Sequence, residues 1–302
     1  MNKRSFLRLS LGMIGLAGMG VATATYPYYR MPGGAARIRL AADGQAVVQM
    51  ASHEMGMGTA TAQALLAAEL LGLPVSQVRF EHGHTDLPPG TLAGGSSQTA
   101  SIAAAVAAAH GELVRELVKL AGNDSPIAGL GPEEVETRDG ALRARAEPGR
   151  SESYVSILQR AGRNELACEA AAPAPNETSE YSMHSYGAQF CEVRVSAVTG
   201  EIRVMRFLGS FDAGRILNAK TAASQFRGGI IMGLGLALTE ETLFDERTGR
   251  IMNPSLAEYH VPVQMDVPEI DVIWTGIPDP HSPFGVRGIG EKIGRASCRE
   301  RV

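Results

Sequence analysis

Gly285-Val286-Arg287-Gly288-Ile289-Gly290-Glu291 is the stretch that decides how the rest of this sequence is interpreted. Glycine orders at a high entropic cost and has no side chain to pack, so three glycines in seven residues predict a loop. Such a loop lets the backbone approach a ligand closely and leaves one carboxylate, that of Glu291, accessible. Taken alone, the stretch fits a solvated turn as well as a catalytic glutamate.

The segment before this loop predicts a helix that contains an unusual number of glycines. Asp212, Gly214 and Asn218 lead into it, and the helical pattern runs through Gln225 to Leu238. Each glycine inside a helix costs up to about 1 kcal/mol relative to alanine. We therefore expect this helix to pack closely on another element or on a cofactor. A predicted strand over 269–274 lies between the helix and the loop.

Two glycine-rich loops open helices in the first half of the chain. Residues 53–59 precede a helical pattern that stops before Pro74, and residues 84–95 lead to a long alanine-rich helix that runs toward Leu120. Polar side chains at a helix start are often ordinary caps. The exposed amides and the positive end of the helix dipole also bind anions. Two such starts together favour a shared cradle for an anionic or polar ligand.

The remaining patterns predict an α+β fold built from two mixed α/β subdomains. Alternating residues and turn signals indicate hairpins within 36–51, 134–144 and 189–207, a strand at 78–81 and a helix at 153–161. We expect hairpins and small sheets packed with Gly- and Ala-rich helices. The predicted boundaries place the first subdomain at 36–170, a linker at 171–180 and the second subdomain at 181–292, with 1–35 and 293–302 outside both.

Composition excludes several classes of function. With 302 residues, 44% of them hydrophobic, the chain is long enough for a sizeable core, and its net charge of −4 provides no basic footprint for nucleic acid. Cys168, Cys191 and Cys298 are too far apart to predict a disulfide or an iron-sulfur site. His82, His84 and Asp86 fit a proline-rich surface loop better than a metal site. No transmembrane segment is predicted.

The order of the motifs resembles the molybdenum-binding subunit of the xanthine dehydrogenase and aldehyde oxidoreductase family, over roughly 20–291. Each motif is weak alone, and the order carries the resemblance. The motifs are Glu54-Met55-Gly56-Met57-Gly58, Gly94 to Ala100, Gly187-Ala188 with Glu192-Val193, Asp212-x-Gly214 with Asn218, Gln225 with Gly228, Asn253 with Leu256 and Tyr259, and the loop that ends at Glu291.

The resemblance implies a molybdopterin-binding domain and assigns its site residues. Glu291 is the implied general base, which takes a proton while an aldehyde or N-heterocycle is oxidised at molybdenum. The metal is held through the dithiolene of the pterin, so no protein ligand is expected. The implied cofactor-binding residues are Gly56, Met57, Gly58, Gly94, Gly95, Ser96, Ser97, Gln98, Thr99, Gly187, Ala188, Gln225 and Gly290.

The resemblance also implies partners. The cofactor is expected to be molybdopterin cytosine dinucleotide, with 2Fe-2S and FAD carried by an iron-sulfur subunit and an FAD subunit, and with the remaining half of the molybdenum subunit beside this chain. A periplasmic location is favoured by the resemblance and a cytoplasmic one stays open. The alternative function is a cofactor-binding or assembly module that lacks catalysis.

The sequence departs from the family pattern in four respects, of which two, the short length and the last ten residues, weaken the expectation of activity. Met57 replaces a glutamine that bonds the cofactor, and Arg227 replaces a common glutamate. The chain is shorter than the family's subunit, and residues 293–302 look like a translated sequencing adapter, which indicates an incomplete gene. The Gly20 to Pro27 segment resembles an internal segment of the subunit, so we expect core there, while Lys3-Arg4-Ser5-Phe6-Leu7 and the apolar run after it keep a weak export signal open as the alternative. Arg287 would oppose a raised pKa of Glu291 if it pointed into the site.

Overall fold

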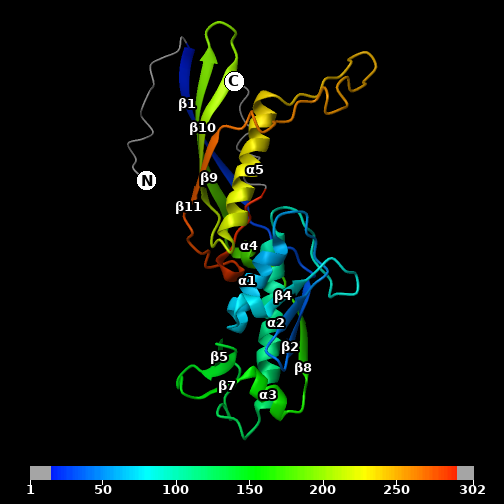
Figure 1. Cartoon of the computed structure of the whole chain (residues 1–302), viewed down its shortest axis with the longest axis vertical. Helices are drawn as coiled ribbons and strands as arrows, with labels where there is room; N and C mark the ends of the chain where they lie inside the picture. Colours follow the sequence, from blue (N-terminus) through cyan, green and yellow to red (C-terminus); the bar gives the residue numbers. More distant parts are fainter. Residues whose placement is uncertain (1–14, 291–302) are drawn as a thin grey trace.

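The computed structural model describes residues 15–290 and has a mixed α/β architecture with several small sheets (Figure 1). One four-stranded sheet has the order β1-β9-β10-β11. Its strands are β1 (Gly15–Pro27), β9 (His184–Ser196), β10 (Ile202–Asp212) and β11 (Glu269–Trp274). The first three are antiparallel neighbours, and β11 pairs parallel to β10. Helix α5 (Ala219–Leu238) connects β10 to β11, as a parallel pair requires a crossover.

The second four-stranded sheet has the order β4-β3-β2-β8 and carries the two predicted long helices. Its strands are β2 (Ala35–Ala41), β3 (Ala46–Gln49), β4 (Val78–Glu81) and β8 (Glu165–Ala171). Helix α1 (Thr59–Leu71) and the 3-10 turn η2 (Val75–Gln77) join β3 to the parallel β4, and α2 (Gln98–Ala121) packs against β2 and β8. A three-stranded sheet follows, made of β5 (Val135–Arg138), β6 (Ala141–Ala144) and β7 (Ser151–Ser153), with α3 (Tyr154–Arg160) behind it.

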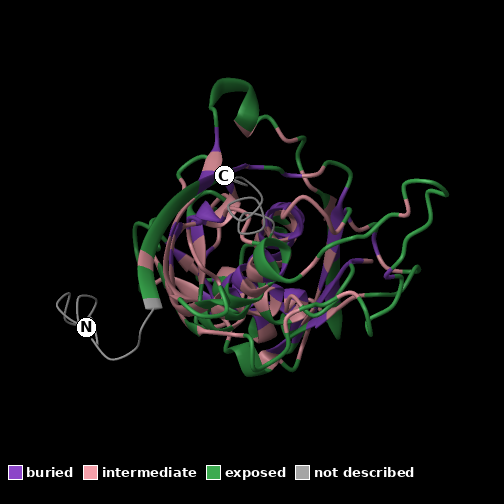
Figure 2. Ribbon diagram, turned by 90° about the horizontal axis from the view of Figure 1, so that it is seen from above, coloured by how far each residue is buried: buried purple, intermediate pink, exposed green. Residues whose placement is uncertain are grey.

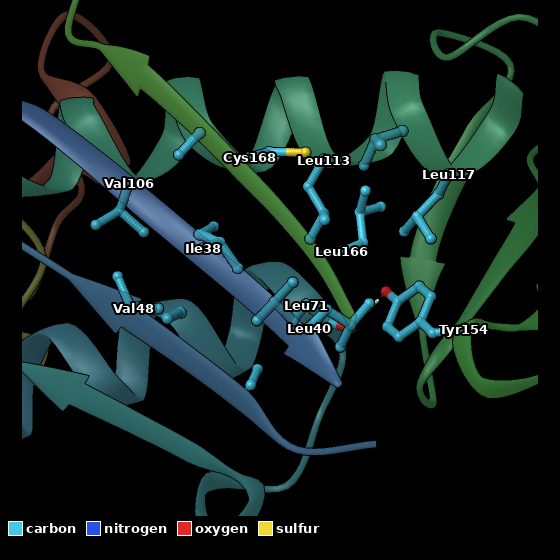
Figure 3. Packing of buried hydrophobic residues seen from close by; sticks show 14 of the residues in the cluster. Ile38, Leu40, Val48, Leu71, Val106, Leu113, Leu117, Tyr154, Leu166 and Cys168 are labelled. Atoms are coloured by element: carbon cyan, nitrogen blue, oxygen red, sulfur yellow. Dashed lines mark hydrogen bonds between the residues drawn. The ribbon is translucent and has the colours of Figure 1, made fainter. Parts of the chain in front are cut away.

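The largest core lies between α2 and the second sheet (Figure 3). Ile38 and Leu40 of β2 and Leu113 and Leu117 of α2 are fully buried there. Tyr154 is also buried, and its hydroxyl donates a hydrogen bond of 2.7 Å to the carbonyl oxygen of Leu71. Burying a polar group without a partner is costly, so this bond makes a tyrosine acceptable in an otherwise apolar core.

A second, smaller core attaches α5 to the first sheet. Phe226 of α5 stacks on Phe211 of β10 with ring centroids 4.1 Å apart, and Trp274 of β11 lies next to Phe226. The predicted close packing of the glycine-rich helix holds at Gly235, where an added Cβ would meet Pro262 at 2.7 Å. It does not hold at Gly228, where an added Cβ would have nothing within 4 Å.

Most predicted elements are present with similar bounds. The strands at 78–81 and 269–274, the hairpins β2–β3 and β5–β6, and the helices α1, α2, α3 and α5 are confirmed. β1, β7 and β8 were not predicted as strands. β8 contains two glutamates, three alanines and only one large apolar residue, so its β-propensity is low, and its place in the sheet comes from pairing with β2.

The segment predicted as a linker is held in place by Arg30. The short helix α4 (Glu177–Glu180) lies within it. The Arg30 Nε donates to Glu177 at 2.6 Å, and its two Nη atoms donate to the carbonyl oxygens of Pro173 and Ala174. Arg30 and Glu177 are both mostly buried, and such pairs hold specific geometry more than they add stability. Residues 173–177 are therefore anchored to the segment that follows β1.

β1 joins the N-terminal segment to the sheet of residues 184–274. It pairs with β9 along its whole length, so residues 15–27, which the sequence placed outside both subdomains, are structurally part of the second one. The expected core position holds for Ala24 and Tyr26, which are buried. It is wrong for Val21, whose side chain is exposed, as are those of Leu16 and Met19 before it. Most of this edge strand is exposed (Figure 2).

Residues 240–265, here called the arm, protrude from the end of α5 (Figure 1). Two polar side chains give the arm its shape, because Asn253 bridges Leu243 and Glu241 and the Tyr259 hydroxyl bonds to Glu240. Its exposed apolar side chains are Leu243, Phe244, Ile251, Met252, Leu256, Val263 and Met265. The arm therefore presents an apolar surface that this chain does not cover.

The described part of the chain contains two of the three cysteines. Cys168 and Cys191 are free thiols, and Cys298 lies outside the described residues. Burial raises the pKa of both thiols, and nearby glutamates raise it further, so neither is activated.

Within residues 15–290, none of the helices has the length and apolar character needed to span a bilayer.

Candidate functional site

A cavity of about 450 Å³ lies where the two halves of the chain meet. Three segments form its walls: the loop and start of α1, the loop and start of α2, and the start of α5 together with residues 286–290. In Figure 1 these helix starts face one another at the junction of the two large sheets. The glycine-rich and polar loops that precede these helices therefore contribute to one cavity, although its first and last lining residues, Met55 and Gly290, are 235 positions apart in the chain.

The cavity brings together most of the predicted cofactor-binding residues. Those that line it are Met57, Gly58, Gly94, Ser96, Ser97, Gln98, Thr99, Gln225 and Gly290. Gly56 and Gly95 are adjacent in sequence to lining residues but are not part of the lining. Gly187 and Ala188 also do not line it, since both lie within β9, between β1 and β10. Glu291 lies outside the described residues, one position beyond Gly290.

The start of α2 forms a wall that is held mainly by its own hydrogen bonds. The Ser97 hydroxyl donates to the carbonyl oxygen of Gly94 at 2.7 Å. Gln98 donates to the His53 carbonyl oxygen at 3.0 Å and accepts from Thr59 at 3.4 Å, which ties α2 to the loop before α1. Ser96 has a positive φ of 52°, an unusual conformation for a residue other than glycine. We infer that Ser97 and Gln98 shape the cavity more than they bind its contents.

The start of α1 does not act as an anion site. The Glu54 carboxylate accepts hydrogen bonds from the backbone N–H groups of Gly56 at 2.9 Å, Gly58 at 3.0 Å and Ala60 at 3.3 Å. Burial raises the pKa of Glu54, but these amide bonds outweigh that effect and hold it below its usual value. The predicted shared cradle is therefore wrong for α1, because the chain's own carboxylate occupies its N-terminus.

We expect Glu54→Gln to destabilise the fold at neutral pH by roughly 0.5 to 2 kcal/mol, the range for loss of a helix N-terminal cap. Because the folded-state pKa is depressed, this stabilisation is present above the unfolded pKa of about 4.3 and is lost as the pH falls through the folded pKa. Urea unfolding of wild type and variant should therefore differ at pH 7 and converge in acid. The exposed Glu258→Gln serves as a control, and a difference that persists unchanged in acid would contradict the capping role.

The start of α5 forms the third wall. Asn218 caps the helix, accepting from the backbone N–H groups of Lys220 and Thr221 at 3.0 and 3.3 Å. Thr221 packs against Gly58, where an added Cβ would meet its methyl group at 2.9 Å. Arg215 also lines the cavity and pairs with Glu69 of α1. These contacts fasten α5 to α1 across the junction.

Residues 285–290 close the cavity against α2. An added Cβ on Gly288 would meet both the Cβ and the carbonyl oxygen of Ser96 at 2.7 Å, so a side chain does not fit there. The Ser185 hydroxyl donates to the carbonyl oxygen of Gly288 at 3.1 Å. An added Cβ on Gly290 would lie 3.5 Å from the Ser96 hydroxyl and 3.7 Å from the Gln225 side-chain oxygen. The loop is thus fixed between two helices and β9, unlike a solvated turn.

Arg287 lines the cavity, and its guanidinium is held by two carboxylates and a carbonyl oxygen. Its Nη2 donates to both Asp212 oxygens at 2.8 Å, its Nη1 donates to the His184 carbonyl oxygen at 2.5 Å, and its Nε is 3.3 Å from Asp279. Burial raises the pKa of Asp212, but a hydrogen bond from Thr275 and the charge of Arg287 outweigh it and keep the carboxylate ionised at neutral pH. The sequence did not decide whether the Arg287 side chain points toward Glu291. In the structure its guanidinium is paired with the carboxylates of Asp212 and Asp279.

Sequence reasoning missed several lining residues. Thr59, Arg215, Thr221 and Ala222 line the cavity but were not proposed as site residues. All four lie in the first turn of α1 or α5, or just before it, and this position is the one feature they share in the sequence. The predicted helix starts therefore could have indicated these positions, but not their side-chain directions.

A second cavity of about 830 Å³ lies elsewhere, between the end of α1 and the β5–β6 turn. None of the predicted site residues lines it, and the motifs point to the smaller cavity, which we take as the functional site. Among residues 15–290 no group of three or more His, Cys, Asp or Glu side chains is placed to hold a metal ion. His84 and Asp86 form an exposed contact of 3.4 Å.

The cavity is suited to a polar ligand that approaches the backbone closely. Its walls offer glycine backbone at four positions and hydroxyl or amide side chains from all three segments. Among the described lining residues none is acidic, so an anionic ligand would meet no adjacent negative charge from the wall itself. Such a surface suits a ligand with several hydrogen-bonding groups, including an anionic one.

Residues 11–268 match the family described as the molybdopterin cofactor-binding domain. The chain is 35% identical over 277 residues to the aldehyde oxidoreductase molybdenum-binding subunit PaoC of Escherichia coli (strain K12), covering 91% of this chain and 36% of that protein. It is 30% identical over 297 residues to the putative xanthine dehydrogenase molybdenum-binding subunit XdhA of the same organism, covering 91% and 37%. The chain thus spans about a third of the length of these curated relatives.

Solved structures show the same fold. The reconstituted CO dehydrogenase from Oligotropha carboxidovorans aligns with a TM-score of 0.81 at 22% identity, covering 94% of this chain and 37% of that one. Quinoline 2-oxidoreductase from Pseudomonas putida 86 aligns with a TM-score of 0.78 at 23% identity, covering 94% and 38%. At these identities the likeness concerns the fold alone.

Proposed function

Since this chain belongs to the molybdopterin-binding subunits of the xanthine and aldehyde oxidoreductase family, we propose that it is the part of such a subunit that binds the cofactor and carries the catalytic base for hydroxylating aldehydes or N-heterocycles. One observation carries the proposal. The cavity gathers residues from the predicted α1, α2, α5 and 285–290 motifs, which are far apart in sequence and which the resemblance assigns to the cofactor.

The described residues fit a pterin cofactor. Gly58, Gly94, Gly288 and Gly290 line the cavity with backbone, and Gln225 of α5 and Ser96 and Thr99 at the start of α2 offer polar groups to it. We propose that these three side chains and the amides at the start of α2 hold the pterin and its phosphates. Met57 supplies an apolar surface in place of the usual glutamine side chain. Gly187 and Ala188 of β9 do not line the cavity, and the contact from β9 to its wall is the Ser185 hydrogen bond to the Gly288 carbonyl oxygen.

When bound, the cofactor supplies the two-electron oxidation chemistry of molybdenum. The protein's own residues position the substrate carbon, exclude water and move one proton. We propose that the Glu291 carboxylate is the base that takes this proton, because it follows directly on Gly290 of the cavity wall. A general base works best with its pKa near the working pH, and a dry pocket raises the pKa of a carboxyl group in that direction.

The finer cofactor and partner assignments are also proposals. We propose molybdopterin cytosine dinucleotide as the cofactor, with 2Fe-2S and FAD on an iron-sulfur subunit and an FAD subunit. Relatives named as subunits or as chains of complexes support a multi-subunit assembly. The exposed apolar side chains of the arm support a covering partner, and we propose the remaining part of the molybdenum subunit in this role.

The cofactor assignment predicts the effect of Gln225→Ala in the complete molybdenum subunit. Loss of one polar contact in the wall should lower the molybdenum content of the purified protein, measured by metal analysis, and the cytosine nucleotide released by acid hydrolysis should fall in parallel. Gln159→Ala, at an exposed position on α3, is the matched control. Equal molybdenum content in both variants would contradict the assignment, and full content without turnover in wild type would favour the non-catalytic alternative.

A further inference from the structure

Arg287 lies in the middle of the loop that leads to the proposed base. Only 11% of its side chain is exposed, and its guanidinium contacts three separate elements: Asp212 at the end of β10, His184 at the start of β9, and Asp279 after β11. Asp212 is in turn held by the Thr275 hydroxyl at 2.9 Å. The guanidinium fork therefore joins one end of the first sheet to the loop.

Backbone contacts on both sides of Arg287 make the loop rigid. The Arg287 N–H donates to the Ala213 carbonyl oxygen at 3.0 Å, and the Arg215 N–H donates to the Gly285 carbonyl oxygen at 2.7 Å. Beyond Arg287, Gly288 is held by Ser185 and abuts Ser96. A side chain that fixes residue 287 in this setting also restricts the direction in which the chain leaves Gly290.

The charge of Arg287 is compensated within the protein. One guanidinium faces two carboxylates, those of Asp212 and Asp279, which leaves this group of three with a net charge of −1. A cation matched in this way is poorly suited to anchor an anionic ligand in the cavity. Its three nitrogens instead face three different partners, Nη2 Asp212, Nη1 the His184 carbonyl oxygen and Nε Asp279, and the single ammonium of a lysine does not reproduce this planar arrangement.

We propose that Arg287 is a positioning residue, which orients residues 288–290, the segment that precedes Glu291 in the sequence, through its contacts with Asp212, Asp279 and His184 and does not act as a ligand of the cofactor or substrate. The proposal rests on the proposed function, because it assumes that Glu291 is the base. Two roles are possible for an arginine at this place, positioning the loop and binding an anion, and they require different properties of the side chain. Positioning requires the planar fork, whereas anion binding requires only a positive charge.

The test compares Arg287→Lys and Arg287→Ala in the complete molybdenum enzyme. Positioning predicts that both variants lose about 10²-fold in kcat, the effect of misplacing a catalytic group, while KM and molybdenum content stay unchanged. Guanidinium ion added to Arg287→Ala should restore part of the rate. Amide hydrogen exchange of a peptide covering 285–290 should become faster in both variants, a readout that does not depend on turnover.

Arg206→Lys is the matched control, because Arg206 forms a similar two-bond pair with Glu192 on the same sheet but does not line the cavity. It should keep wild-type kcat. Asp212→Asn, which preserves side-chain volume, should reproduce the loss in kcat and replaces Arg287→Ala if that variant does not fold.

Two results would overturn the proposal: a wild-type kcat in Arg287→Lys, or a rise in KM or loss of molybdenum as the main effect of Arg287→Ala. Failure of the proposed function looks different, since Glu291→Gln would then retain turnover whatever the Arg287 variants do. If Glu291→Gln is inactive and Arg287→Lys is active, only the positioning role fails.

Discussion

Replacing Glu291 with glutamine is expected to lower kcat of the complete molybdenum enzyme by about 10²- to 10⁴-fold, the usual contribution of a general base. Glutamine has nearly the same size as glutamate but cannot accept the proton, so substrate binding and cofactor retention should persist. Steady-state kinetics with an aldehyde substrate, together with molybdenum analysis of the same preparation, measure this directly. The expected pattern is full molybdenum content with turnover nearly lost.

The control for this variant is Glu112→Gln on α2, which removes a carboxylate that pairs with Arg115 outside the cavity lining. That change should leave kcat within experimental error of wild type. Turnover of Glu291→Gln at the wild-type rate would remove the central element of the proposed function. Loss of molybdenum in Glu291→Gln would instead indicate that the residue supports the cofactor site and is not simply a base.

Gly214→Ala is expected to destabilise the chain strongly. Gly214 has a φ of 70°, and an added Cβ would lie 2.3 Å from the carbonyl oxygen of Gly285. A residue other than glycine in this conformation costs on the order of 1 to 3 kcal/mol, and overpacking adds on the order of 1 to 3 kcal/mol. The collision would also push residues 285–287 away from the end of β10. Urea unfolding should show a lower midpoint, and kcat of the complete enzyme should fall with it.

Gly228→Ala provides the contrasting control. Gly228 is an exposed glycine within α5, and an added Cβ has nothing within 4 Å. Alanine should therefore stabilise the helix by up to about 1 kcal/mol. If Gly214→Ala and Gly228→Ala shifted the unfolding midpoint equally, the close approach of residues 214 and 285 would not be the reason for glycine at position 214.

The elements that the sequence predicted well are those with strong local signals. The bounds of β4 and β11 match the predicted 78–81 and 269–274, since β4 alternates apolar and polar residues and β11 does so at its start, the pattern typical of a half-buried strand. The helices α2 and α5 begin within a few residues of their polar starts for the same reason. β1 and β8 were missed because they are edge strands, and their place depends on partners far along the chain.

At the candidate site, the sequence predicted which residues come together but not all of the contacts that they make. The motif order placed Ser96, Gln98, Gln225 and Gly290 at one cofactor, and the cavity does gather them. The same motifs suggested that the start of α1 binds an anion, whereas Glu54 caps it from within the protein. Local pattern could not distinguish these cases, because a helix start offers the same amides to a ligand and to a nearby side chain.

From its sequence alone, this chain was recognisable as an α+β molybdopterin-binding domain, and its glycine-rich loops and polar helix starts were identifiable as candidates for the site. These features depend on residue types and on their order over short stretches of chain, and both can be read from the sequence. The tertiary structure alone decided that Arg287 is paired with Asp212 and Asp279, that the Glu54 carboxylate faces the amides of α1, and that β1 completes the sheet beside β9. Side-chain direction and long-range pairing depend on distances between residues remote in sequence, and only the folded chain sets those distances.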